Sequence, residues 1–356
     1  MKSKLKFSIV LFFVLAANCI LFAQPVEYYQ TVWGLNGTEL KTGLHEIIKD
    51  HNAQNWPLWM NFPQTDAKAD GKVWDIYSDI PGSAPAYVFE FVQDQCGNYS
   101  KEADCYNHEH TWPSTFFNDA DPMRTDLFHV LPTDGYVNNK RSNLPYGKVS
   151  TLQYTSANGS KVGLSNSFPG YTDKVFEPLD SFKGDLARIY FYMSTRYEGE
   201  DGSWKDWTMA TGAELTPAAV QLLLEWHHLD PISQKEINRN NAVFTIQDNR
   251  NPFVDYPEFA DCIWGNSSCI GLNTNNTYAG NEFTIFPNPL TDNRLRISNN
   301  SNSTPIQIQI IDINGRILEQ LPADQQVFDV SDLPQGMYYI QILQKEGIYT
   351  APFVHL

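Results

Sequence analysis

The segment from residue 106 to residue 147 constrains the fold of this chain more than any other part of the sequence. It opens with NHEHTWPS, a strand-like run that meets Trp112-Pro113, and proline ends a strand because it has no N–H to donate to a sheet. Further along, Thr133 and Asp134 are residues that start helices, and Gly147 is a residue that stops them. The segment therefore predicts a strand hairpin that faces a short helix.

Glu109 and His110 in this segment carry chemistry suited to hydrolysis. A neutral imidazole takes a proton from water near pH 7, so His110 is the candidate general base. A carboxylate suits a hard cation such as Mg²⁺, so Glu109 is the candidate metal ligand. Neighbouring side chains on an extended strand point to opposite faces, and the two serve one site only if the strand ends there.

The polar run that follows supplies partners for this pair. Asn138 and Asn139 offer amide oxygens, and either one is a candidate second metal ligand. Lys140 and Arg141 are cations able to hold a phosphate, and arginine does so with two prongs. Asn143 closes the run. A base, a metal ligand set and a phosphate-binding cation are what the hydrolysis of a phosphodiester requires.

These residues resemble the bacterial endonuclease I family, which consists of secreted or periplasmic nucleases with a ββα-metal, or His-Me finger, site. Three later blocks continue the resemblance in order: residues 182–197, 215–231 and 236–259. The similarity spans roughly residues 28–265.

The resemblance implies a role for each residue of the motif. His110 would activate water, Glu109 and Asn138 would bind one metal ion, and Arg141 would be a second catalytic residue on the structural or phosphate side. The ion is expected to be Mg²⁺, with Mn²⁺ and Ca²⁺ as alternatives. The candidate substrate-binding residues are His108, Lys140, Asn143, Arg188 and Arg250.

The chain departs from the family pattern in two respects. An arginine often stands before the Glu-His pair, and here that residue is His108. The family also uses a separate arginine to hold the product phosphate, and the spacing does not identify it. The candidates are Arg124, Arg188, Arg239 and Arg250.

Structural roles compete with functional ones at several positions. His129 lies in an apolar run, which favours a buried and hydrogen-bonded histidine. His227 and His228 follow a tryptophan at the end of a predicted helix, where a cation complements the helix dipole. For Arg188, an ion pair within the protein and a contact to phosphate explain the sequence equally well. For Arg250, a contact that fixes a loop is a better explanation than a contact to substrate.

Two other function classes remain open on the sequence. A zinc-dependent hydrolase would use His108 and His110, because alternate residues of a strand share a face, with His129 or Asp126 as a third ligand. That hypothesis leaves the Asn-Arg run unexplained. The second alternative is a surface-displayed binding protein with a decayed nuclease site, which the strong acidic charge favours.

The first 23 residues have the form of a signal peptide, with three lysines, an apolar run and a small residue at Ala23. Four cysteines then remain, and an even number in an exported chain predicts two disulfides. Four cysteines allow three pairings. The local pairs, Cys96 with Cys105 and Cys262 with Cys269, are the ones we favour.

The net charge runs against a nucleic-acid substrate. It is −16 for the full chain, and loss of the three signal-peptide lysines leaves 22 basic against 41 acidic residues, or −19. A nucleic-acid binder usually presents a basic surface. Substrate binding is therefore expected to be weak and sensitive to salt.

The chain changes character after Phe259. Residues 266–281 are rich in Asn, Ser, Thr and Gly and predict a linker between a catalytic domain over residues 24–265 and a module over residues 282–356. Short alternating apolar runs with turns such as Asn314-Gly315 predict a small antiparallel β-sandwich. This module resembles the C-terminal sorting domain of type IX secretion, and a carbohydrate-binding module is the alternative.

The catalytic domain is predicted to be α+β and mainly helical. Helices are expected near residues 40–48, after Thr216-Pro217, and after a capping box formed by Ser233 and Glu236. Strands are expected at residues 87–92, at His110 and at residues 243–247.

The combined expectation is a nuclease, exported through the periplasm to the medium or the cell surface. We expect it to cut DNA with little base discrimination and to leave 5′-phosphate products. Whether it also cuts RNA is left open by the sequence. The mature chain is expected to have no transmembrane segment and to be a monomer, with the type IX secretion machinery as its partner.

Overall fold

The computed structural model describes residues 28–265 as a continuous stretch, and part of the chain beyond it. The described C-terminal residues are 283–288, 290, 292–299, 305–312, 317–344 and 347–355. The predicted signal peptide and linker lie outside the described residues. Each part has its own hydrophobic core, one that runs from Tyr29 to Cys262 and one that runs from Phe283 to Phe353.

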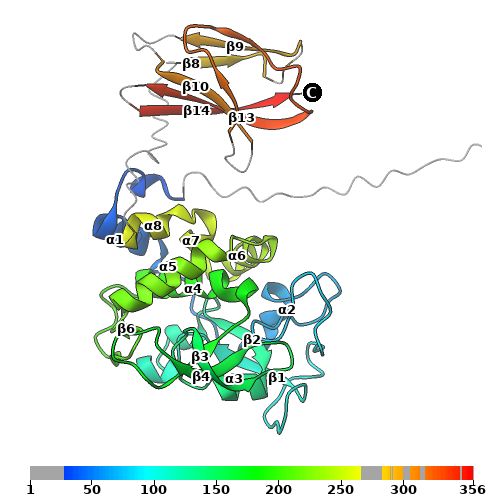
Figure 1. Ribbon diagram of the computed structural model, residues 1–356, viewed down its shortest axis with the longest axis vertical. Helices are drawn as coiled ribbons and strands as arrows, with labels where there is room; N and C mark the ends of the chain where they lie inside the picture. The colour runs from blue at the N-terminus through cyan, green and yellow to red at the C-terminus, as the bar shows by residue number, and fades with distance from the viewer. Residues whose placement is uncertain are drawn as a thin grey trace, which may run out of the picture.

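A hairpin and a helix form the centre of the first part. Strand β1 (Tyr106–His110) pairs antiparallel with β2 (Val130–Asp134), and helix α3 (Gly135–Arg141) follows β2 directly (Figure 1). Asp134 caps the helix, because its side chain accepts hydrogen bonds from the N–H groups of residues 136 and 137. The predicted ββα unit is confirmed. The predicted stop at Gly147 is wrong, because α3 already ends at Arg141, where Ser142 takes a positive φ of 51°.

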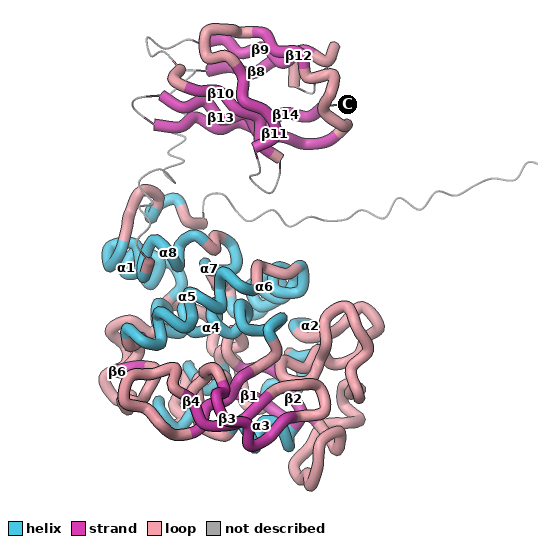
Figure 2. Tube along the Cα trace, in the orientation of Figure 1, coloured by secondary structure: helices cyan, strands magenta, loops and turns pink. Residues whose placement is uncertain are grey.

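The helices form most of the remaining core. Helix α4 (Lys183–Arg196) is buried along its whole length and packs against α5 (Pro217–Leu229) and α1 (Gly37–Ile48). In Figure 2 the long helices gather on one side of this part and the strands β1–β4 on the other. The other α-helices are α2 (Phe62–Thr65), α6 (Gln234–Gln247), α7 (Pro252–Asp255) and α8 (Glu258–Trp264). Short 3-10 helices span Gln30–Val32, Leu58–Met60, Ser114–Phe117, Met123–Thr125 and Asp180–Phe182.

Three predicted helix features are confirmed. The apolar residues Leu40, Leu44 and Ile48 form the buried face of α1. Helix α5 begins with Pro217, and the Thr216 side chain accepts a hydrogen bond from the third residue after it. In α6, Ser233 and Glu236 form both hydrogen bonds of the capping box.

Two predicted strands are wrong. Residues 87–92 form irregular chain and a turn, and Val92 has a φ of 71°, which a β-strand excludes. Residues 243–247 are the last turn of α6. Val243 and Gln247, four residues apart, are both buried there, so the pattern of burial has the helical period rather than that of a strand.

Two further small sheets complete this part. The strands β3 (Val149–Thr155), β4 (Lys161–Ser165) and β5 (Lys174–Glu177) form an antiparallel sheet in that order. The strands β6 (Ala210–Thr211) and β7 (Glu214–Leu215) form a short hairpin. Together with the helices, these sheets make the α+β fold that the sequence predicts.

The C-terminal part is all β in its described residues. One sheet has the order β11-β10-β13-β14 and the other the order β12-β9-β8, and apolar residues of both form one core. This is the predicted sandwich, although the predicted turn at Asn314-Gly315 lies outside the described residues. The strands are β8 (Phe283–Phe286), β9 (Arg294–Asn299), β10 (Gln307–Ile311), β11 (Ile317–Leu321), β12 (Val327–Asp329), β13 (Gly336–Gln344) and β14 (Gly347–His355).

The cysteines follow the predicted local pairing where the structure describes them. Cys96 and Cys105 form a disulfide that closes the loop leading into β1. Cys262 is also disulfide-bonded, and its predicted partner Cys269 lies outside the described residues. Among the described residues, no helix has the length and apolar character needed to cross a membrane.

Candidate active site

A cavity of about 260 Å³ lies at the end of β1, against α3. Six residues predicted for the site line it: His108, Glu109, His110, Asn138, Arg141 and Asn143. The other lining residues are Tyr99, Asn107, Pro113, Ser114, Asn139 and Ser142. Lys140 is not among them, because its ammonium lies over the rings of Tyr136 and Tyr154. The hairpin and the helix thus bring most of the predicted set together; we call this cavity the inner pocket.

His110 has a defined tautomer in the inner pocket. Its Nε2 lies 3.0 Å from the carbonyl oxygen of Arg124. A carbonyl oxygen can only accept, so Nε2 carries the proton and Nδ1 keeps the lone pair. Burial, with a smaller contribution from His129, lowers the pKa of His110 to about 3. The ring is therefore neutral at physiological pH, the state in which a histidine acts as a base.

Glu109 is a buried carboxylate with two defined partners. Its Oε1 accepts a hydrogen bond from the Tyr77 hydroxyl at 2.7 Å and pairs with the Arg141 guanidinium at 3.1 Å. Burial raises the pKa of Glu109, while the charge of Arg141 and the bond from Tyr77 act to lower it. Within the described part of the chain, Oε2 has no hydrogen-bond partner, so one oxygen remains for a cation.

The side chain of Asn138 is oriented so that its amide oxygen, Oδ1, is available to a metal ion. Its Nδ2 donates to the carbonyl oxygen of His108 at 3.0 Å and to Oδ1 of Asn107 at 2.8 Å. Because a backbone carbonyl only accepts, the amide nitrogen must face β1, and Oδ1 is the free donor atom for a metal. Asn139 also lines the inner pocket but has no comparable hydrogen bond among the described residues.

These donors fit a hydrated divalent cation. Glu109 and Asn138 each offer one oxygen, and the inner pocket has room for water beside them. Mg²⁺ keeps several of its waters and needs only one or two protein oxygens, whereas structural zinc takes three or four nitrogen, sulfur or carboxylate ligands. Among the described residues, no three His, Cys, Asp or Glu side chains are grouped to hold an ion.

His108 is occupied by a structural contact. Its Nε2 accepts a hydrogen bond from the backbone N–H of Leu58 at 3.1 Å. Its ring lies 3.8 Å from the ring of Trp59, between centroids, and 5.0 Å from that of Phe62. The lone pair that a zinc site would need on Nε2 is therefore already used.

Arg141 connects α3 to the end of β1. It is 1% exposed, and its N–H groups donate to the carbonyl oxygens of His110, at 3.0 Å, and of Thr111. Burial opposes the charge, yet the carboxylate of Glu109 raises the pKa of Arg141 above its ordinary value. These contacts place Arg141 in support of both Glu109 and the backbone of His110.

The structure does not bring Arg188 and Arg250 into the inner pocket. Arg188 donates to Glu236 at 2.9 Å, and Arg250 donates to Asp255 at 2.8 Å. Both arginines are buried.

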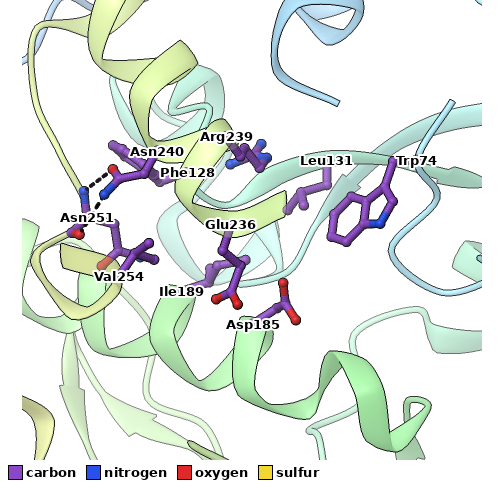
Figure 3. Close-up of a pocket in the computed structure, with 10 residues that line it drawn as sticks. All are labelled: Trp74, Phe128, Leu131, Asp185, Ile189, Glu236, Arg239, Asn240, Asn251 and Val254. Carbon is purple, nitrogen blue, oxygen red and sulfur yellow. Dashed lines mark hydrogen bonds between the residues drawn. The ribbon is translucent and has the colours of Figure 1, made fainter. Parts of the chain in front are cut away.

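Arg239, a third candidate for the phosphate arginine, is also in the interior. It donates to Asp66 at 2.7 Å and lines a small cavity of about 30 Å³. Figure 3 shows it on the helix that also carries Glu236 and Asn240, with Asp185 across the cavity.

Arg124 is the candidate that reaches the site. It lines a second cavity of about 660 Å³, which we call the outer groove. The outer groove shares four residues with the inner pocket, so the two adjoin at the tip of β1: Asn107, His108, His110 and Ser114. Its remaining lining residues are Trp56, Pro57, Trp59, Cys96, Asp119 and Arg124.

Sequence reasoning missed the residues that reach the site from before β1. Tyr77 orients Glu109, and Trp56 and Trp59 form a wall of the outer groove. These residues reach β1 only through tertiary contacts, which include the hydrogen bonds from Leu58 to His108 and from Tyr77 to Glu109. The Trp-Pro pair at Trp56-Pro57, which repeats the pair after His110, is a weak signal that could have drawn attention to it.

The comparison with known protein families agrees with this geometry. The family model for endonuclease I matches residues 36–258, more than half of the chain. The chain belongs to the endonuclease I family. A second family model, for the secretion system C-terminal sorting domain, matches residues 284–354 of this endonuclease I family member.

Curated relatives of this endonuclease I family member are named as nucleases. The "Extracellular ribonuclease" of Bacillus amyloliquefaciens is 33% identical over 253 residues, which is 68% of this chain and 79% of the relative. The protein of the same name from Bacillus subtilis (strain 168) is 33% identical over 260 residues, 70% of this chain and 82% of the relative. "Endonuclease-1" of Buchnera aphidicola subsp. Baizongia pistaciae (strain Bp) is 31% identical over 132 residues, 37% of this chain and 46% of the relative.

The family and the sorting domain together define the general activity and destination. This endonuclease I family member is a secreted nuclease, a hydrolase that acts on the phosphodiester bonds of nucleic acid. Its C-terminal type IX sorting domain directs it to the medium or the cell surface.

Proposed function

We propose that this protein is a one-metal endonuclease that cuts DNA and RNA with little base preference and leaves 5′-phosphate ends. One observation carries the proposal. His110 is neutral, its Nε2–H is held by the Arg124 carbonyl oxygen so that Nδ1 keeps its lone pair, and the residue lines one pocket with Glu109 and Asn138.

His110 acts as the general base. Its Nδ1 takes a proton from water, and the water oxygen forms a bond to phosphorus in line with the leaving 3′ oxygen. The P–O3′ bond then breaks, its electron pair goes to O3′, and O3′ takes a proton from solvent. The upstream fragment thus ends in a 3′ hydroxyl, and the phosphate stays on the 5′ oxygen of the downstream fragment.

Glu109 and Asn138 would hold the metal ion. When bound there, Mg²⁺, or Mn²⁺ or Ca²⁺ in its place, would supply positive charge that stabilises the negative charge developing on the phosphate. The charge of Arg141 favours the ionised form of Glu109, against the effect of its burial, and Tyr77 fixes the direction of the carboxylate. Through its bond to the His110 carbonyl oxygen, Arg141 also holds the base in place, which makes it a positioning residue.

Arg124 is the residue we assign to the phosphate. It lines the outer groove at the tip of β1, and its own carbonyl oxygen orients His110. The other candidates Arg188, Arg239 and Arg250 are buried against carboxylates. A guanidinium there offers two parallel donors to a phosphate.

Both DNA and RNA are proposed as substrates. The two relatives that match most of this chain are named extracellular ribonucleases, and the shorter match is named an endonuclease. Contacts to the sugar-phosphate backbone carry no sequence information, and base selectivity is therefore expected to be low.

The test is digestion of plasmid DNA and of a long RNA by the purified chain, with and without Mg²⁺, beside His110→Ala. We expect metal-dependent cutting that falls at least about a hundredfold in the variant, the scale of a lost general base. His228→Ala is the matched control, because this histidine is more than half exposed and bonds Asp261. If the folded, disulfide-intact protein cuts neither substrate with any divalent ion, the proposal fails and surface binding becomes the better hypothesis.

The zinc alternative makes a different prediction. It requires that His108→Ala abolish activity as strongly as His110→Ala, and that Mg²⁺ restore nothing to the metal-free protein. The bond from Leu58 N–H to Nε2 of His108 argues against it.

A further inference from the structure

We propose that the outer groove binds an unpaired nucleobase next to the scissile phosphate, with the indole of Trp56 as the stacking surface. The protein would then cut single-stranded nucleic acid, or unpaired stretches, in preference to a duplex. This inference rests on the proposed nuclease function.

Trp56 stands directly beside the catalytic histidine. Its ring is stacked on that of His110, with 5.6 Å between centroids and 25° between planes, and it lies 4.5 Å from the ring of His108. It nevertheless remains 38% exposed. A large aromatic surface left open beside reacting groups is a natural stacking surface for a base, because every base has a π face.

The segment that carries Trp56 is held in place. The N–H of Leu58 donates to Nε2 of His108, and the rings of Trp59 and Phe62 pack on the same imidazole. His108, which stands where the family often has an arginine, therefore attaches the aromatic wall to β1. A surface fixed in this way loses little freedom when a base stacks on it.

The outer groove has the size for a nucleotide, and its lining holds one cation, Arg124, and one carboxylate, Asp119. Its volume of about 660 Å³ lies within the range typical of small-molecule sites. The guanidinium of Arg124 lies 4.8 Å from the centre of the Trp56 ring and can neutralise the phosphate of the stacked nucleotide. Trp56 is 38% exposed with the Arg124 guanidinium over its ring, so part of the indole is open to a ligand in the outer groove.

This geometry selects for unpaired bases. In a duplex each base is stacked on its neighbours and paired, and its faces are not available to an indole without unstacking. In a single strand the bases splay out and stack on aromatic side chains. Trp56 would thus add to the binding of single strands without reading their sequence.

The test compares an intact single-stranded DNA oligonucleotide with one that lacks a single base, and the same pair in RNA. Product sizing gives the cleavage rate at each bond next to the missing base. We expect the full-length wild type to cut one of these bonds at least about tenfold more slowly than in the intact strand, in line with the effect of losing one stacked base. In Trp56→Ala the intact and base-free strands should be cut at the same rate, and Trp56→Phe should keep most of the difference.

The control is Met60→Ala, a change in the same segment at a side chain that is 78% exposed and does not line the outer groove. It should leave all rates unchanged. The proposal is overturned if Trp56→Ala slows the intact and base-free strands equally, or if the wild type cuts both alike. If Trp56→Ala does not fold, the proposal is decided by how fast the wild type cuts the intact and the base-free strands.

A failure of the nuclease function gives a different result, namely no cutting by the wild type of any strand. The binding of the same fluorescently labelled oligonucleotides then decides the inference. Tighter binding of the intact strand that is lost in Trp56→Ala supports the base site, and equal binding of both strands overturns it.

Discussion

Among single residues, Asn138 and Asn139 differ in what orients their amides. Of the two, only Asn138 donates its amide nitrogen to the His108 carbonyl oxygen, and this leaves its side-chain oxygen Oδ1 available to a metal ion. We therefore expect Asn138→Ala to raise the Mg²⁺ concentration needed for half-maximal cutting at least about tenfold, since a lost ligand should cost no less than a lost outer-shell partner. Asn139→Ala should raise it less than about threefold. Titration of activity with Mg²⁺, with circular dichroism as a check on folding, measures both, and the reverse order of effects would contradict the assignment.

Arg124 is the residue for which the phosphate contact is testable. Loss of one charged donor to a transferring phosphate commonly lowers the rate a hundredfold or more, so Arg124→Ala should lower kcat/KM by about 10². Arg124→Lys should restore part of it, because lysine keeps the charge but not the two-pronged contact. Arg294→Ala, an exposed arginine of the sorting domain, is the control. Steady-state kinetics on one substrate would refute the role if Arg124→Ala and Arg294→Ala behaved alike.

Sequence reasoning identified the residues that meet at the site better than it identified the partners of the arginines. His110, Glu109 and Asn138 come from two short blocks whose residue types imply their chemistry. The ion pair between Arg188 and Glu236 joins α4 and α6, two helices that are far apart in the sequence. No local sequence pattern shows that Arg188 pairs with a carboxylate. Its burial and its distance to Glu236 in the structure do show this.

At the scale of elements, the ββα unit was predictable because it is continuous in the chain. Strand β2 runs directly into α3, and Asp134 is a side-chain cap whose effect is local. The failure at residues 243–247 has an equally local cause. Apolar residues suggested a strand there, but the capping box at Ser233 had already started a helix that continues through them.

The disulfide that leads into β1 should support both stability and activity. It closes a loop between cysteines nine positions apart, and the chain-entropy estimate for such a loop is about 2.5 kcal/mol. We expect Cys96→Ser combined with Cys105→Ser to lower the free energy of unfolding by about that amount. Activity should fall as well, because Cys96 lines the outer groove.

Urea denaturation of the oxidised wild type and the double variant measures how much the disulfide adds to the free energy of unfolding. The wild type with reductant is the second reference, and it should be no more stable than the variant, because reductant also opens the disulfide of Cys262. Equal midpoints for the oxidised wild type and the double variant would show that the disulfide does not stabilise the fold.

At the scale of the whole molecule, substrate binding and folding stability depend on the combined charges of many groups. The predicted weak and salt-sensitive binding follows from a net charge of −16, and it stays a prediction. The pH dependence of stability is likewise a sum. Burial lowers the pKa of His129 and His227, each to about 4, while burial raises the pKa of Asp75 to about 7 and that of Asp185 well above its ordinary value.

These two sets of groups act in opposite directions between pH 4 and pH 6.5. In that window a buried histidine is neutral in the folded chain and protonated in the unfolded chain, so the unfolded state binds more protons and acid destabilises the fold. A carboxyl with a raised pKa binds its proton in the folded state first, so acid favours the fold. The total slope is therefore a difference, and a single group is best tested by comparing variants.

His227 allows such a comparison. Its Nε2 lies 3.1 Å from the carbonyl oxygen of Pro257 and its Nδ1 lies 3.3 Å from Arg188, contacts that an uncharged glutamine can replace in part. Relative to His227→Gln, the wild type should lose up to about 1.4 kcal/mol of stability per pH unit as the pH falls from 6.5 towards 4. Urea denaturation of both proteins at a series of pH values gives this difference. A constant difference between wild type and His227→Gln across this range would mean that His227 takes up its proton equally in both states, contrary to its burial.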